Sequence, residues 1–214
     1  MIEDHVGDRY LFDSANRPVT CLAEVPHWAE VAERLPTADR PRPAVSDGVA
    51  YLPSPPRVTL LIVGGGHVGQ AVGKLAGELG FAVWVLDDRE KFANVDRFPA
   101  AERVLVGDIG TTLRDLRPHL TAHTCALVVT RGHNHDEEAL YHLAGSACGY
   151  VGMIGSRRKV KLIFDDLAAK GVPAESLARV RAPVGVDIGS QTVPEIAVSI
   201  AAELIAWRNR GKAA

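Results

Sequence analysis

The stretch Leu60–Gly69, LLIVGGGHVG, decides the fold, because an apolar run breaks into glycines and then becomes amphipathic. Apolar residues follow at helical spacing, so the stretch predicts a buried strand, a tight turn and a helix. In such a turn Gly64 makes the sharp bend, Gly66 lets a pyrophosphate approach the backbone, and Gly69 lets the helix pack closely on the strand. The free amides at the helix start favour an anion. The stretch is therefore typical of a dinucleotide-binding unit.

The rest of the chain from Arg57 onward alternates strand and helix patterns. This alternation predicts an α/β fold, a Rossmann-like, doubly wound and mainly parallel sheet with helices on both faces. Helices are expected at 112–116, 136–147, 156–170 and 194–208. A sixth strand is expected at 179–182.

The first part of the chain reads as a small appendage. A hairpin is expected at 10–22, a short helix at 28–35, and an edge hairpin or strand at 47–52. Six prolines between residues 36 and 56 disfavour a long helix or a central strand there. We therefore expect residues 1–56 to form a small N-terminal segment with a proline-rich linker, and residues 57–214 to form the Rossmann-like domain.

Composition narrows the class of protein. Hydrophobic residues make up 47% of the chain, charged residues 23%, and the formal net charge is −2, as in ordinary globular proteins without a general affinity for nucleic acid. The three cysteines, Cys21, Cys125 and Cys148, form no CxxC pair, which favours a reducing compartment. No run of 18 apolar residues and no apolar signal core is present, so we expect a cytoplasmic protein that does not bind membranes.

Polar residues follow the predicted strands, at the sheet edge where such folds bind ligands. His67 lies inside the glycine turn, where it either faces a bound phosphate or merely caps the turn. Asp87 and Asp88 end the next apolar run, where an acid meets ribose hydroxyls, whereas Arg89 suits a phosphate on that ribose. Preference between NAD and NADP therefore stays open.

The segment Thr130–Asp136 carries two histidines and an aspartate within four residues. Imidazole and carboxylate suit several metals, but no further ligand set with zinc-like spacing appears. A polar turn capped by Asn134 or Asp136 explains the composition more simply, so we expect no metal site. His133 is kept as a candidate cofactor contact.

The segment Gly155–Lys159 places three cations in the first turn of a predicted helix. Cations there oppose the positive end of the helix dipole unless an anion offsets them. Ser156 as N-cap, with Arg157 and Arg158, therefore predicts a phosphate site, the alternative being a solvated basic face or a contact with an acidic protein.

The loop before the last helix contains two glycines and the carboxylate of Asp187. It either closes over a ligand or is an ordinary loop. Thr192 is expected as the N-cap of the last helix, with Pro194 in its first turn.

Five segments together resemble the XdhC/CoxI family, the accessory factors of xanthine dehydrogenase and related molybdenum hydroxylases. They are Leu61–Gly69, Asp87–Arg89, Tyr150–Lys159, Ala182–Gly189 and Pro194–Glu203. The resemblance covers about residues 57–210. The first 57 residues lack the cysteine-containing N-terminal module of the longer members.

The resemblance implies that the chain binds the molybdenum cofactor, as molybdopterin or its dinucleotide form, assists its sulfuration and hands it to a hydroxylase apoenzyme. A cysteine desulfurase is a second implied partner, and a homo-oligomer is a further expectation. The residues themselves leave two alternatives, an NAD(P)-dependent oxidoreductase and a nucleotide-sensing Rossmann module, and no catalytic residue is assigned. The candidate cofactor contacts are Gly64, Gly66, His67, Gly69, Asp87, Asp88, Arg89, His133, Ser156, Arg157, Arg158 and Asp187.

Overall fold

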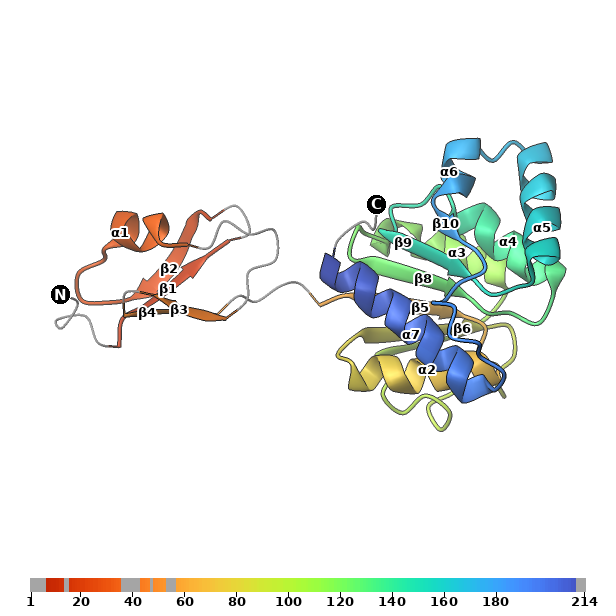
Figure 1. Cartoon of the computed structure of the whole chain (residues 1–214), viewed down its shortest axis with the longest axis horizontal. Coiled ribbons are helices and arrows are strands. Elements are labelled where there is room, and N and C mark those ends of the chain that lie inside the picture. The colour runs from red at the N-terminus through yellow and green to blue at the C-terminus, as the bar shows by residue number, and fades with distance from the viewer. Residues whose placement is uncertain (1–6, 14–15, 36–42, 47, 53–56, 211–214) are drawn as a thin grey trace. The chain divides into compact units, whose positions relative to one another are not determined.

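The computed structural model describes residues 7–13, 16–35, 43–46, 48–52 and 57–210 of the chain. The chain divides into two compact units, Met1–Pro55 and Pro56–Ala214 (Figure 1). Most of the proline-rich stretch of the sequence lies outside the described residues. No described helix combines the length and the apolar character needed to cross a membrane.

The described residues of the smaller unit form two hairpins and one short helix. Strands β1 (Arg9–Phe12) and β2 (Pro18–Leu22) pair antiparallel, as do β3 (Ala44–Ser46) and β4 (Val49–Tyr51). Helix α1 (Trp28–Glu33) places the Trp28 ring edge-on against two aromatic side chains of β1. The first hairpin and the helix are confirmed, and the expected element at 47–52 is the second strand of the β3–β4 hairpin.

The larger unit contains one six-stranded sheet with the order β10-β9-β8-β5-β6-β7, in which all neighbours are parallel. The four central strands β5, β6, β8 and β9 are short, mostly buried and nearly continuous in apolar residues, as expected for a sheet covered on both faces. The Rossmann-like fold class is therefore confirmed. The strands are β5 (Thr59–Val63), β6 (Ala82–Asp87), β7 (Arg103–Val106), β8 (Thr124–Val128), β9 (Tyr150–Met153) and β10 (Val180–Arg181).

Two layers of helices enclose this sheet (Figure 1). On one face α2 and α7 pack together over a core that includes Leu60, Ile62 and Ile200. On the other face α3, α4 and α5 cover a core that includes Leu61, Leu140 and Ile163. The helices are α2 (His67–Glu78), α3 (Ile109–Leu116), α4 (His133–Leu143), α5 (Arg157–Ala169), α6 (Ala174–Ala178) and α7 (Val193–Arg210).

Helix α4 differs from its prediction. It begins three residues before the expected start at 136 and ends at Leu143 rather than 147. Its N-cap is Gly132, so the expected cap by Asn134 or Asp136 is wrong. Asp136 is fully buried instead and accepts hydrogen bonds from the backbone N–H and the hydroxyl of Thr130.

Helix α3 also begins earlier than expected, because the Asp108 carboxylate accepts a 2.8 Å hydrogen bond from the Thr111 N–H and caps it. Helix α6 was not expected from the sequence. The predicted N-cap of α7 is confirmed, since Thr192 Oγ1 accepts from the Glu195 N–H while Glu195 Oε2 accepts from the Thr192 N–H.

Candidate functional site

The candidate site lies along the edge of the sheet where the parallel strands end. Val63 aligns with Leu86 on one side and with Val128 on the other, and Val128 aligns with Met153. The residues that follow these four positions therefore share one edge. The chain order reverses between β5 and β8, and this switch point is where doubly wound sheets bind ligands.

The glycine turn after β5 has the close packing that its sequence predicts. Gly64 adopts a φ of +114°, and a Cβ added there would meet the Val129 carbonyl oxygen at 2.5 Å. A Cβ at Gly69 would lie 2.0 Å from the Gly64 carbonyl oxygen. A Cβ at Gly66, by contrast, would have no atom of the described residues within 4 Å. The backbone of the turn is thus tightly packed at Gly64 and Gly69 and accessible at Gly66.

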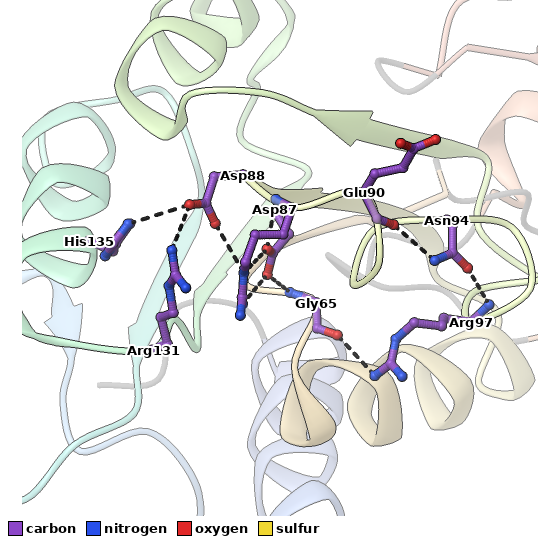
Figure 2. Close-up of polar contacts among 9 residues, drawn as sticks. Gly65, Asp87, Asp88, Glu90, Asn94, Arg97, Arg131 and His135 are labelled. Carbon is purple, nitrogen blue, oxygen red and sulfur yellow. Dashed lines mark hydrogen bonds and ion pairs between the residues drawn. The ribbon is translucent and has the colours of Figure 1, made fainter.

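Both backbone polar groups of Gly65 are held by side chains from the β6–β7 segment (Figure 2). Its N–H donates to Asp87 Oδ2 at 2.8 Å, and its carbonyl accepts from Arg97 Nη2 at 3.2 Å. The Asp87 carboxylate, only 3% exposed, also accepts from the guanidinium of Arg89 at 2.9 Å. Asp87 and Arg89 therefore fix the turn and neutralise each other.

Asp88 lies between Arg131 and His135, which come from the segment after β8 (Figure 2). Its Oδ2 is 2.9 Å from Arg131 Nη2 and 3.7 Å from His135 Nε2. Burial raises the pKa of Asp88, but the neighbouring positive charges of Arg131 and Arg89 oppose this, and the pKa lies below its usual range. Because β5 lies between β6 and β8, this ion-pair network links the two flanks of the glycine turn.

The two helices that start at the switch point have bare N-termini. Helix α2 begins after Gly66 and helix α4 after Gly132, and no side chain of the described residues caps either start. A Cβ at either glycine would meet no described atom within 4 Å. The other long helices of this unit, α3, α5 and α7, are all capped by side chains. The uncapped amides and dipole ends of α2 and α4 therefore favour an anion between β5 and β8.

The predicted contacts His67 and His133 occupy the first positions of these two helices. The side chain of His67 is exposed at the start of α2. The ring of His133 instead points from α4 toward α5, where its Nε2 lies 3.1 Å from Asp166 Oδ2. The histidines and aspartate of the Thr130–Asp136 segment do not converge, because His135 pairs with Asp88 and Asp136 pairs with Lys159.

The start of α5 keeps two of its three cations free for an anion. Ser156 Oγ accepts from the Lys159 N–H at 3.3 Å, so the predicted N-cap is confirmed. Lys159 forms an ion pair with the buried Asp136. Arg157 and Arg158 are exposed and form no ion pair with any residue that the structure describes.

The loop after β10 is attached to the sheet and to α7 through Glu203. Its Oε1 accepts from the Tyr150 hydroxyl at 2.8 Å, and its Oε2 accepts from the Gly185 N–H at 2.6 Å. Desolvation and the nearby Glu203 carboxylate raise the pKa of Tyr150. Asp187 is exposed and accepts a hydrogen bond from the Gly189 N–H within the same loop.

The edge of the sheet thus collects the glycine turn, Asp87–Arg89 and the start of α5, whereas His133 faces α5. The structure adds three residues that the sequence does not mark as candidates: Arg97, Arg131 and Glu203. Arg97 lies within the long loop between β6 and β7, which has no strand or helix pattern, so no local signal marks it. Arg131 could have been predicted from its position. It follows the end of β8, and Asp88 follows the end of β6 on the other side of β5, so both side chains lie at the same edge of the sheet.

One family profile matches this unit: that of the XdhC Rossmann domain, over residues 60–204. Among curated proteins, the "Uncharacterized protein YqeB" of Escherichia coli (strain K12) is 36% identical over 156 residues, which are 72% of this chain and 28% of that protein. A protein of Bacillus subtilis (strain 168), described as a probable xanthine dehydrogenase subunit, is 30% identical over 155 residues, 72% of this chain and 44% of that protein.

A solved structure described as a xanthine dehydrogenase from Bacillus halodurans is also similar. It has a TM-score of 0.61 and 26% identity, over 73% of this chain and 44% of that chain. The chain therefore spans less than half the length of each of these relatives.

Proposed function

Because the chain belongs to the family of the XdhC Rossmann domain, we propose that it is an accessory factor of a xanthine dehydrogenase-type molybdenum hydroxylase. Two relatives carry xanthine dehydrogenase in their descriptions, which supports this role. We extend the proposal to its ligand, the molybdenum cofactor as molybdopterin or its dinucleotide form. The protein would hold this cofactor, assist its sulfuration and deliver it to the apoenzyme.

The observation that carries the ligand proposal is the pair of uncapped helix starts at Gly66 and Gly132. The phosphate of molybdopterin, or the pyrophosphate of its dinucleotide, has the charge that these amides favour. Arg157 and Arg158, which pair with no acid in the described part of the chain, follow strand β9 beside β8 and add donors for phosphate oxygens. When bound, the cofactor supplies the molybdenum and pterin chemistry, and this chain supplies the anion-binding edge.

The state of Asp87 favours this proposal over an NAD(P)-dependent oxidoreductase. In dinucleotide-binding sheets, an acid at this position accepts from the ribose hydroxyls. Here both oxygens of Asp87 already accept from Gly65 and Arg89. The neighbouring Asp88 is paired with Arg131. The four hydrogen bonds to Asp87 leave that carboxylate no acceptor position for a ribose in this arrangement.

The cysteines of this unit support an external source of sulfur. Cys125 and Cys148 are both buried, and desolvation raises the pKa of each thiol. A thiol rather than a thiolate is a poor acceptor of sulfur. We therefore infer that a cysteine desulfurase or another partner brings the sulfur, while this chain shields the cofactor.

The test is retention of the cofactor by the purified full chain. Protein mixed with freshly released molybdenum cofactor is desalted, and bound pterin is measured by fluorescence after oxidation. We expect the double variant Arg157→Ala/Arg158→Ala to retain at least about tenfold less pterin, because two charge-assisted contacts are lost. Lys161→Ala, an exposed cation on the same helix, is the matched control and should retain as much as the parent.

Thermal melting with NAD+, NADP+ and ATP completes the test. The proposal predicts no stabilisation by the nicotinamide nucleotides. Stabilisation by NAD+ or NADP+ without pterin retention would instead support an oxidoreductase. Stabilisation by ATP with a change of oligomeric state would support a nucleotide-sensing module.

A further inference from the structure

A second cluster of ligating side chains lies between α4 and α5. It consists of His133 and Glu137, one turn apart on α4, and Asp166 on α5. His133 Nε2 is 3.1 Å from Asp166 Oδ2 and 3.6 Å from Glu137 Oε2. One atom from each of the three side chains lies within 4.8 Å of the others.

Hydrogen bonding alone does not satisfy this cluster. A single imidazole nitrogen carries at most one proton, so Nε2 can donate to Asp166 or to Glu137 but not fully to both. The second oxygen of Glu137 is paired with Lys170, which leaves Oε2 directed toward the ring. Two carboxylates therefore converge on one nitrogen, with one lysine offsetting their charge.

A divalent metal ion satisfies all three groups together. Zinc binds imidazole nitrogen and carboxylate oxygen at about 2.0–2.2 Å, so adjacent ligand atoms of a tetrahedral site lie about 3.3 Å apart. The two distances from His133 Nε2 fall on either side of this value. The Asp166 and Glu137 oxygens lie within 4.8 Å of each other and must rotate to reach this spacing, and Asp166, at 55% exposed, has room to turn.

We propose that His133, Glu137 and Asp166 form a divalent transition-metal site that takes Zn²⁺ or a similar ion. One nitrogen and two carboxylate oxygens suit zinc, cobalt and manganese, with water completing the coordination. The site lies between α4 and α5, and the proposal does not depend on cofactor binding at Gly66. Lys170 competes with the metal for Glu137, so the affinity should be lower than that of a closed structural zinc site.

The test is titration of the untagged full chain with Zn²⁺ by calorimetry, after treatment with EDTA and its removal. We expect one equivalent to bind, and Co²⁺ to give visible d–d absorption without the intense charge-transfer band of a thiolate ligand. His133→Asn, Glu137→Gln and Asp166→Asn should each weaken Zn²⁺ binding at least about tenfold. Circular dichroism and thermal melting in EDTA verify that each variant folds.

Matched controls separate this site from general attraction of cations. His123→Asn and Glu138→Gln, both exposed and outside the cluster, should leave Zn²⁺ affinity unchanged. Lys170→Met should tighten binding because it frees Glu137, whereas Lys161→Met, which removes the same charge elsewhere on α5, should not. The proposal is overturned if the parent binds no Zn²⁺, or if His135→Asn abolishes binding while Asp166→Asn does not.

Discussion

The glycine turn has no space for a methyl group at Gly69 but has space for one at Gly66. The Gly69 Cβ would lie 2.0 Å from the Gly64 carbonyl oxygen and 3.2 Å from a methyl of Ile62. We expect Gly69→Ala to lower the free energy of unfolding by about 1–3 kcal/mol, as overpacking does. Urea denaturation measures this cost.

Gly66→Ala is the matched change in the same turn. Its Cβ meets open space and its φ of −63° suits any residue, so it should cost less than about 1 kcal/mol. The added methyl group would nevertheless occupy the approach to the bare start of α2, and pterin retention should fall. A large loss of stability in this variant would show that Gly66 is needed for folding rather than for a ligand.

His142 on α4 makes stability depend on pH. Desolvation and the nearby Arg114 lower its pKa, although Glu138 and Asp108 act in the opposite direction. The unfolded chain, with a histidine pKa of about 6.5, therefore takes up this proton before the folded chain does. The stabilisation is present above the unfolded pKa and is lost as pH falls from about 6.5 through the folded pKa.

The measurement is unfolding by urea between pH 7.5 and 5. We expect His142→Gln to lose less stability over this range than the parent, while the exposed His123→Gln follows the parent. Parallel curves for the parent and His142→Gln would refute the assignment to His142.

At the scale of elements, Glu203 joins β9, α7 and the loop after β10. Glutamine at this position can keep its amide oxygen toward the Gly185 N–H and donate its NH₂ to the Tyr150 hydroxyl oxygen, but both hydrogen bonds lose the charge of the carboxylate. We expect Glu203→Gln to cost about 1–3 kcal/mol, the range for hydrogen bonds to a charged group. Amide hydrogen exchange at Gly185 should also accelerate.

Glu78→Gln, on the exposed surface of α2, is the control and should change neither quantity. If Glu203→Gln lowers stability but leaves Gly185 exchange unchanged, the loop is held by other contacts.

The sequence predicts elements well where local pattern and tertiary burial agree. The strands β5, β6, β8 and β9 are apolar because helices cover both faces of the sheet, so each can be predicted from its run of apolar residues. The start of α4 was not predicted correctly. Aspartate is a common N-cap residue, but Asp136 forms an ion pair with Lys159, which lies 23 residues further along the chain. The glycine turn and Ser156 carry local signals, whereas Arg97 and Asp166 reach their partners only through tertiary packing.

At the scale of the whole molecule, the buried apolar side chains of the described residues are distributed unequally between the two units. Both clusters of buried apolar residues belong to Pro56–Ala214. Among the described residues of Met1–Pro55, Tyr51 alone is a buried hydrophobic residue. Because small units bury a smaller fraction of their surface and are correspondingly marginal, the first unit should open more readily than the second.

Limited proteolysis of the full chain tests this difference. We expect early cleavage within residues 1–55 and a resistant fragment that contains the whole sheet. The fragment should unfold at the same urea concentration as the parent and retain the same amount of pterin, because the glycine turn, Asp87–Arg89 and the start of α5 all belong to it. A lower unfolding midpoint would mean that the first unit stabilises the sheet. An unchanged midpoint with lost pterin would instead place part of the ligand site in the first unit.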